Sequence, residues 1–156
     1  MKTRFILPIL AASLFASIAW VPARQADEDK TISAADISEV IKDLKLEAEE
    51  EKDSEDKTFW TITTKDDEKI VLYQYGGKGD VATSLGVSAF FKEEADLDVL
   101  DSWNRDARFT KAYSADDELI VLESDVDLSV SPSKAAVKRF LETFTTAIPK
   151  FIETLK

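Results

Sequence analysis

The residues of this sequence that could do chemistry are carboxylates, and the most regularly spaced are Glu123, Asp125 and Asp127. Their alternation along a predicted strand places all three on one face of a sheet. Adjacent carboxylates can transfer protons or bind calcium, but these three lack the surrounding spacing of a calcium-binding loop. Because Asp and Glu number 31 in 156 residues, chance clustering is expected. We interpret them as a charged strand edge that discourages aggregation and rank a carboxylate-based enzyme last among the functional hypotheses.

The composition excludes most other chemistry. Histidine and cysteine are both absent, which excludes Ser-His-Asp and Cys-His nucleophiles, thiol redox chemistry, disulfides and the usual zinc sites. The formal net charge is -11, and a surface of this sign repels phosphate backbones, so nucleic acid is not an expected partner. We therefore predict a protein that is not an enzyme and has no catalytic residue, metal site or cofactor.

Aromatic and amide side chains could instead form a binding surface. Trp103-Asn104-Arg105 joins a large aromatic side chain to an amide near the end of a predicted helix. Such positions also suit structural roles, because Asn104 can cap backbone groups and Arg108 can pair with nearby acids. The candidate binding residues are Trp60, Tyr73, Tyr75, Trp103, Asn104, Arg108 and Tyr113.

The scaffold that must position these residues is predicted by hydrophobic periodicity. Helices are expected over 33–44, 97–106 and from 133 to the C-terminus, and strands over 58–64, 70–75, 82–91, 108–114 and 118–128. The sequence therefore predicts a single α+β domain with an antiparallel five-stranded sheet, in the order α-β-β-β-α-β-β-α.

Four local features refine this prediction. Ser33 with Asp36 three residues later is typical of a helix-capping box. The charged segment from Glu47 to Asp56 is interpreted as a solvated helix end and linker. Gly86 within a strand indicates a bulge or a close backbone approach. Pro149 removes a backbone donor, so we expect a kink or break in the last helix there.

Several predicted strands are apolar on both sides. Phe59 and Trp60 must point to opposite faces, and the stretch 119–122 (LIVL) is apolar throughout. Leaving such side chains in water is unfavourable by about 1.5–3 kcal/mol each. Two alternatives stay open at this stage: the last helix completes the core internally, or the second face meets another chain or an apolar ligand.

The N-terminus predicts export. Lys2 and Arg4 precede an uncharged apolar stretch over 5–21, as in a secretory signal peptide. Cleavage after Ala23 is favoured and cleavage after Ala19 is the alternative, while an uncleaved anchor is disfavoured because the stretch is short for a membrane span. We expect residues 1–23 to be a signal peptide, 24–32 a flexible segment and 33–156 the folded domain, with no membrane insertion after cleavage.

The stretch 100–128 reads LDSWNRDARFTKAYSADDELIVLESDVDL. It resembles the bacterial YbjN-type domain family, which is described as a putative sensory transduction regulator. The matching features are Trp103-Asn104, Arg108-Phe109, Ala112-Tyr113, the acidic turn Asp116-Asp117, and the strand that ends at Asp125 and Leu128. The wider order of elements extends the resemblance to about residues 33–155, and the segment 129–132 (SVSP) departs from the Gly-containing turn usual there.

The resemblance implies a fold similar to type III secretion chaperones and a bacterial periplasmic location for an exported member. It supplies no catalytic residues for this chain. We expect a non-enzymatic binding or regulatory module that engages a protein segment, or a second copy in a homodimer, through an apolar sheet face. The alternative is a carrier of a small apolar ligand held between the last helix and the sheet.

Overall fold

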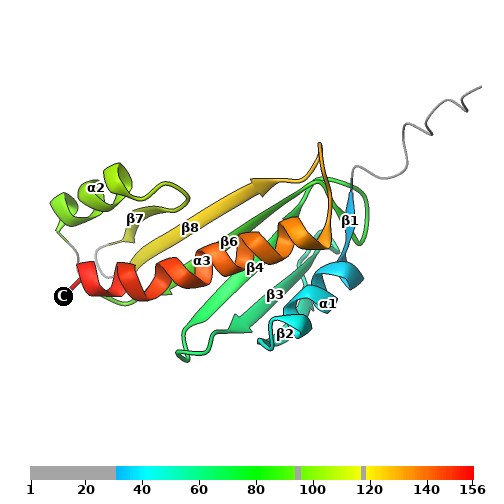
Figure 1. Cartoon of the computed structure of the whole chain (residues 1–156), viewed down its shortest axis with the longest axis horizontal. Coiled ribbons are helices and arrows are strands. Elements are labelled where there is room, and N and C mark those ends of the chain that lie inside the picture. The colour runs from blue at the N-terminus through cyan, green and yellow to red at the C-terminus, as the bar shows by residue number, and fades with distance from the viewer. Residues whose placement is uncertain (1–30, 94–95, 117–118) are drawn as a thin grey trace, which may run out of the picture.

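The computed structural model describes residues 31–93, 96–116 and 119–156, and Figure 1 shows a twisted sheet with helices packed on one side. The main sheet has six strands, and every neighbouring pair is antiparallel. Its order is β2 (Glu47–Lys52), β3 (Thr58–Thr63), β4 (Lys69–Tyr75), β6 (Ser84–Phe91), β8 (Leu119–Asp127) and β7 (Lys111–Asp116). The short strands β1 (Ile32–Ser33) and β5 (Val81–Ala82) pair as a separate two-stranded sheet.

Three helices complete the described chain: α1 (Ala34–Asp43), α2 (Leu97–Asp106) and α3 (Lys134–Thr154). None of these helices is long and apolar enough to cross a membrane. The expected signal peptide over 1–23 lies outside the described residues, as does most of the expected flexible segment. Ile32, the last residue of that segment, is buried in β1.

The α+β prediction is confirmed, but the expected five-stranded sheet is wrong. The extra strand is β2, which lies within the segment that we interpreted as a helix end and linker. Its side chains are all exposed, so it carries no apolar periodicity to reveal it. Backbone pairing with β3 forms β2 instead, and Lys45, with φ 57°, redirects the chain after α1. The expected strand over 82–91 is likewise divided into β5 and β6.

The α1 helix begins at a complete capping box. The Ser33 hydroxyl accepts from the Asp36 backbone N–H at 3.1 Å, and the Ser33 backbone N–H donates to the Asp36 carboxylate. Lys134, at the start of α3, lies 3.1 Å from Asp36 and 2.6 Å from Glu39. The beginnings of α1 and α3 are therefore held together at one end of the sheet.

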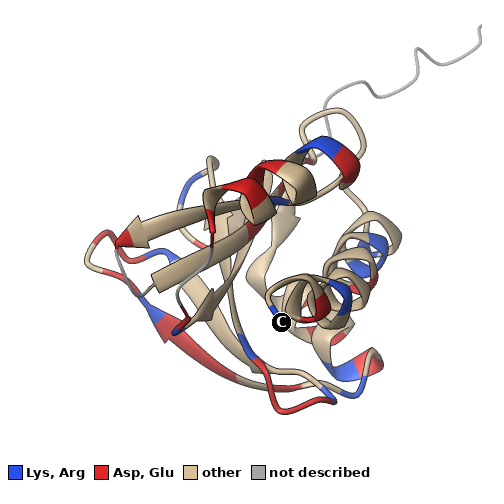
Figure 2. Ribbon diagram, turned by 90° about the vertical axis from the view of Figure 1, so that its left-hand side faces the viewer, with Lys and Arg blue, Asp and Glu red and all other residues tan. Residues whose placement is uncertain are grey.

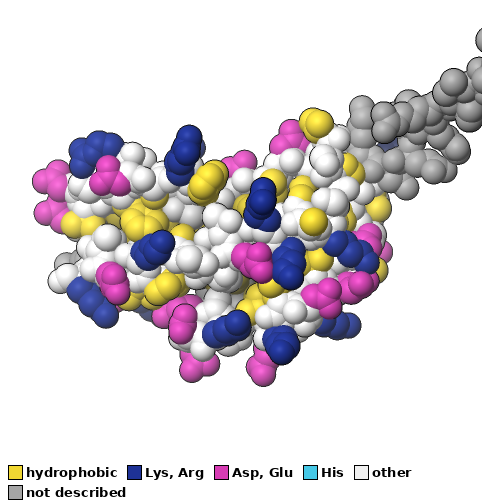
Figure 3. Space-filling model, viewed as in Figure 1, with side chains coloured by type: hydrophobic (Ala, Val, Ile, Leu, Met, Phe, Trp, Pro, Cys, Tyr) yellow, Lys and Arg dark blue, Asp and Glu magenta, His cyan; other side chains and the backbone are white. Residues whose placement is uncertain are grey.

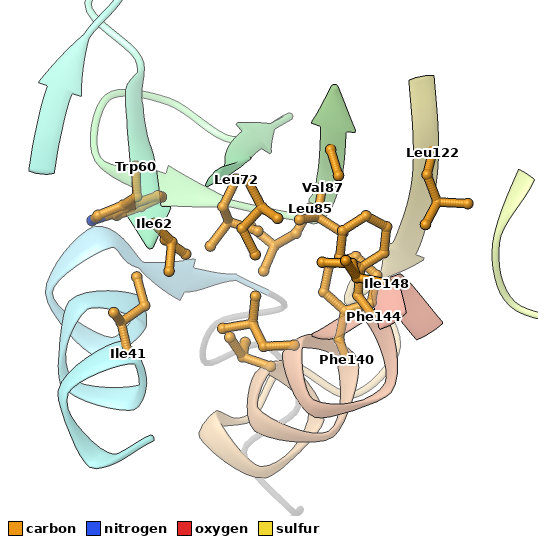
Figure 4. Packing of buried hydrophobic residues seen from close by; sticks show 14 of the residues in the cluster. Ile41, Trp60, Ile62, Leu72, Leu85, Val87, Leu122, Phe140, Phe144 and Ile148 are labelled. Carbon is orange, nitrogen blue, oxygen red and sulfur yellow. The ribbon is translucent and has the colours of Figure 1, made fainter. Parts of the chain in front are cut away.

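The α3 helix covers the centre of the inner face, which is the sheet face toward the helices (Figure 4). Phe144, Ile148 and Phe151 are at most 2% exposed and belong to the same core cluster as Leu72, from β4, and Leu122, from β8. Burial of each such side chain contributes about 1.5–3 kcal/mol. This packing fixes the helix on the sheet.

Pro149 does not break α3. The helix continues as one element from Lys134 to Thr154, and Pro149 lies on its exposed side. Of the two alternatives expected at Pro149, the break is wrong, and the kink stays a prediction. Buried residues on both sides of the proline, Ile148 and Phe151, hold the chain against the sheet and offset the lost backbone hydrogen bond.

The α2 helix is fixed to β7 by one amide side chain. The Asn104 amide accepts from the Ala112 backbone N–H at 2.7 Å and donates to the Ala112 carbonyl at 2.8 Å. Trp103 donates to the Thr110 hydroxyl at 3.1 Å and packs edge-on against Phe151 of α3. The expected strand over 108–114 consequently starts only at Lys111, because 107–110 forms the corner between α2 and β7.

The capping box gives the stability of the fold a predictable pH dependence. The pKa of Asp36 is lowered from its usual 3.8, first by the hydrogen bond from Ser33 and then by the one from Lys134. The folded state therefore favours the carboxylate, and this stabilisation is present at neutral pH and is lost as the pH falls below 3.8.

We expect Asp36→Asn to lower the free energy of unfolding at neutral pH, and the difference from wild type to shrink as the pH falls below 3.8 and Asp36 becomes protonated. Urea denaturation over this pH range measures the effect. Asp66→Asn, in the exposed turn between β3 and β4, is the control and should show no comparable difference. A deficit in Asp36→Asn that persists unchanged at the lowest pH would contradict the assignment.

Candidate functional site

The outer face is the side of the six-stranded sheet that points away from the helices. Side chains alternate along each strand, and the buried partners of α1, α2 and α3 all lie on the inner face. Figure 2 shows the helices gathered on one side of the strands. No helix in the described ranges covers the outer face.

Aromatic rings form a strip at the centre of the outer face. Phe59 and Tyr73 stack with ring centroids 6.0 Å apart, and Tyr73 and Tyr75 stack at 6.3 Å. The Tyr75 ring then extends over Gly86, where an added Cβ would lie 2.7 Å from a ring carbon. The close approach expected at Gly86 is thus present, whereas the register of β6 with both neighbours is continuous and contains no bulge there.

A second aromatic group lies toward the other end of the same face. Phe90, Val121 and Tyr113 are adjacent across β6, β8 and β7. Phe90 is 45% exposed and Tyr113 44% exposed, while Val121 between them is buried. Successive side chains of the 119–122 stretch therefore point to opposite faces. Ile120 and Leu122 enter the core, and Val121 is covered on the outer face by its two aromatic neighbours.

Carboxylates border the aromatic strip on both sides. Glu123, Asp125 and Asp127 share the outer face, as predicted, because they pair with Ser88, Gly86 and Ser84 of β6. Their interpretation as a strand edge is correct only in part: β7 pairs with β8 as far as Glu123, and beyond it Asp125 and Asp127 have no strand partner on that side among the described residues. The acidic edge strand is β2, whose outer-face side chains are Glu47, Glu49 and Glu51, opposite Thr63, Thr61 and Phe59 of β3.

Burial and nearby charges on this face raise the pKa values of two tyrosines, Tyr73 and Tyr113. Partial burial raises the pKa of Tyr113 above its usual 10.0, and the nearby charge of Glu123 and its hydrogen bond with Tyr113 raise it further. The Tyr113 hydroxyl lies 3.2 Å from a Glu123 carboxylate oxygen. Burial, followed by the charge of Tyr75, also raises the pKa of Tyr73. These tyrosines are neutral donors at physiological pH, suited to binding rather than to proton abstraction.

A groove, which we call the α3 groove, lies between α3 and the corner 107–110, and its second hollow extends to Glu123 and Asp125 of β8. Two adjoining hollows of about 620 and 1010 Å³ make up this groove. Figure 3 shows hydrophobic side chains with Lys and Arg among them over this part of the molecule. The residues that line both hollows are Ala107, Arg108, Phe109, Thr110, Arg139 and Thr143.

The seven candidate binding residues fall into three places. Tyr73, Tyr75 and Tyr113 lie on the outer face. Trp103, Asn104 and Arg108 line the α3 groove. Trp60 is 1% exposed and donates its indole N–H to Ser38 and Glu50, so it is a core residue with no surface for a partner.

Two residues of the α3 groove were not among the candidate binding residues. Phe109 is 67% exposed in the corner 107–110, where a strand was expected. Arg139 lies on α3 one helical turn before Thr143, which also lines the groove. The four-residue spacing of Arg139, Thr143 and Ala147 marks one face of the helix, but only the tertiary structure places a cavity beside it. Within the described ranges, no three acidic side chains gather to bind a metal ion.

Gly86→Ala provides a direct probe of the aromatic strip. Because the obstructing atom belongs to the half-exposed Tyr75 ring, we expect the ring to move aside and the free energy of unfolding to change by less than about 1 kcal/mol. NMR chemical shifts of the Tyr75 ring protons measure the displacement. Ser88→Ala, on the same strand and face, is the control. Unchanged Tyr75 signals in Gly86→Ala would contradict this packing.

Comparison with solved structures identifies a similar fold. The Yersinia pestis type III secretion chaperone SycH, solved in complex with a stable fragment of YscM2, matches with a TM-score of 0.55. The match covers 79% of this chain and 98% of the chaperone chain at 16% sequence identity. This similarity confirms the chaperone-like fold, with two differences from the predicted layout: a sixth strand in the sheet and a separate two-stranded sheet.

Sequence comparison supplies the family. No curated protein matches the chain. The family model described as "Putative bacterial sensory transduction regulator" matches residues 33–156, from the N-cap of α1 to the C-terminus. This chain therefore belongs to the YbjN family.

Proposed function

We propose that this protein is a non-enzymatic binding module that holds a segment of another protein against the outer face of its sheet. The observation that carries the proposal is the exposure of three large aromatic side chains on a face that no described helix covers. Tyr75, Phe90 and Tyr113 are each between 44% and 49% exposed. Apolar surface gathered in this way is stabilised when a partner removes it from water.

The comparisons support a role in protein binding without naming a partner. The family is described as a regulator, and SycH was solved with a fragment of another protein bound to it. Binding of a protein segment is thus compatible with this fold, although a shared fold alone does not transfer a partner. The apolar N-terminal stretch supports export, so we place the proposed function in the bacterial periplasm.

A peptide array tests the proposal. The array carries short overlapping peptides. It is incubated in parallel with the wild-type domain and with the double variant Tyr75→Ser/Phe90→Ser, and bound protein is measured on each peptide. We expect the double variant to lose binding to peptides that the wild type retains. Phe109→Ser is the matched control, because it removes a more exposed aromatic side chain from the α3 groove and should leave binding intact. Circular dichroism verifies that all variants are folded.

Two results would contradict the proposal. The first is equal peptide binding by the wild type and the outer-face double variant. The second is a stable dimer in light scattering that the same double variant converts to a monomer, because the outer face would then be occupied by a second copy of this chain.

The α3 groove favours a second candidate function, that of a carrier for a small apolar ligand. Its hollows of about 620 and 1010 Å³ reach the size of small-molecule sites. The walls include Trp103 and Phe109 from the α2–β7 side and Ala147 from α3. A ligand held between the last helix and the sheet is compatible with the second hollow, which residues of β8 and α3 both line.

Native mass spectrometry tests the carrier function. If it is correct, purified protein retains an additional small mass, and Ala147→Trp, which fills the groove, abolishes the retention. Ala35→Trp, at an exposed position of α1 that lines neither hollow, is the control and should retain the ligand. A wild-type protein without additional mass, including after incubation with long-chain fatty acids, would remove this candidate.

A further inference from the structure

We propose that the segment bound on the outer face is cationic, with Lys or Arg at both ends of a short extended apolar stretch. This inference rests on the proposed function and specifies the chemistry of its partner. It follows from one row of side chains that crosses the sheet at right angles to the strands.

The row consists of five residues in cross-strand register. Glu51 of β2 pairs with Phe59 of β3, which pairs with Tyr73 of β4. Tyr73 pairs with Gly86 of β6, and Gly86 pairs with Asp125 of β8. All five therefore share the outer face, and the Tyr75 ring occupies the space above Gly86. An aromatic surface is thus enclosed by one carboxylate at each end.

The two end carboxylates are available to a partner. Glu51 and Asp125 are exposed. Neither forms an ion pair or a side-chain hydrogen bond with another residue in the ranges 31–93, 96–116 and 119–156. Surface carboxylates that are unpaired in the free protein do not have to break an existing contact before they bind a cation.

The outer face as a whole is negatively charged, like the two end carboxylates. Its acidic side chains are Glu47, Glu49 and Glu51 on β2 and Glu123, Asp125 and Asp127 on β8. The basic side chains on the six strands of this face are Lys69 and Lys111. A second copy would bring two such acidic faces together, and a nucleic acid would bring phosphates to them; both approaches are opposed by repulsion. A basic segment is attracted, and its cationic groups can also stack on Tyr and Phe rings.

The row also specifies the spacing of the cations. Four strand intervals separate Glu51 from Asp125, a distance of about 19 Å for strands 4.7–4.9 Å apart. An extended peptide advances about 3.3 Å per residue, so its first and seventh residues span about 20 Å and point to the same side. The third and fifth residues point to that side as well, where they can meet the aromatic strip. The matching segment therefore alternates, with cations at the first and seventh positions and apolar residues at the third and fifth.

The α3 groove differs from the outer face in its charges. The side chains that line it carry charges of both signs in equal number: Arg108, Lys111, Arg139 and Lys150, with Asp106, Glu123, Asp125 and Glu142. A cationic segment should therefore prefer the outer face, where acidic side chains outnumber basic ones. Asp125 borders both surfaces, whereas Glu51 lines neither hollow, so Glu51 is the residue that distinguishes the outer face from the groove.

The test uses a fluorescein-labelled peptide, Lys-Ser-Leu-Ser-Leu-Ser-Lys, titrated into the full chain lacking residues 1–23 and followed by anisotropy. We expect saturable binding that weakens with added salt. The variant Glu51→Gln/Asp125→Asn should bind about tenfold more weakly. The matched control is Glu142→Gln/Asp66→Asn, which removes the same charge from exposed positions away from the outer face and should bind as wild type does. A peptide with Glu in place of both Lys residues should not bind.

The outcomes separate this inference from the proposed function. If a Gln-ended peptide binds as tightly as the Lys-ended one, and Tyr75→Ser/Phe90→Ser abolishes both, the face binds segments but the cationic chemistry is wrong. If outer-face aromatic substitutions change the binding of neither peptide, the proposed function itself is wrong. Loss of Lys-peptide binding in Phe109→Ser, with retention in Glu51→Gln/Asp125→Asn, would place the segment in the α3 groove and overturn the inference.

Discussion

The packing of α3 on the inner face of the sheet is the contact on which the rest of the structure depends. Its apolar side, from Val137 to Phe151, is buried against strands from the centre of the sheet. The α1 helix is held beside its start through Lys134, and α2 is held beside its end through Trp103 and Phe151. All three helices therefore lie on the same side, and the opposite face of the sheet has to be stabilised without them.

The outer face is stabilised by a mixture of aromatic stacking and charge. Phe59, Tyr73 and Tyr75 cover one another and the bare backbone at Gly86, while Phe90 and Tyr113 cover Val121. Rows of carboxylates on β2 and β8 keep this surface hydrated and oppose unspecific association between copies of the chain. The proposed binding of a cationic segment rests on this combination of exposed aromatic and acidic side chains.

Elements with a local sequence pattern were predicted correctly, whereas features that depend on tertiary contacts were not. The capping box at Ser33, the boundaries of α2 and the strand pair β3–β4 follow from local patterns, and the structure contains them. Strand β2 could not be predicted, because six exposed residues, five of them charged, show no periodicity and become a strand only through pairing with β3. The break at Pro149 was wrong because tertiary burial of α3 outweighs a local preference. Among the candidate residues, Trp60 and Tyr73 look alike in sequence, and only the direction of each side chain separates core from surface.

The sequence by itself determined the α+β class, the family resemblance and the chemistry that is excluded, because composition and short-range periodicity carry that information. The tertiary structure decided which side of each two-sided strand meets the helices, since one face is chosen by the packing of α3 and α1 over many residues at once. It also decided that carboxylates 74 positions apart in the chain, Glu51 and Asp125, lie in one row. That juxtaposition depends on strand order and register, which are set by contacts between distant segments.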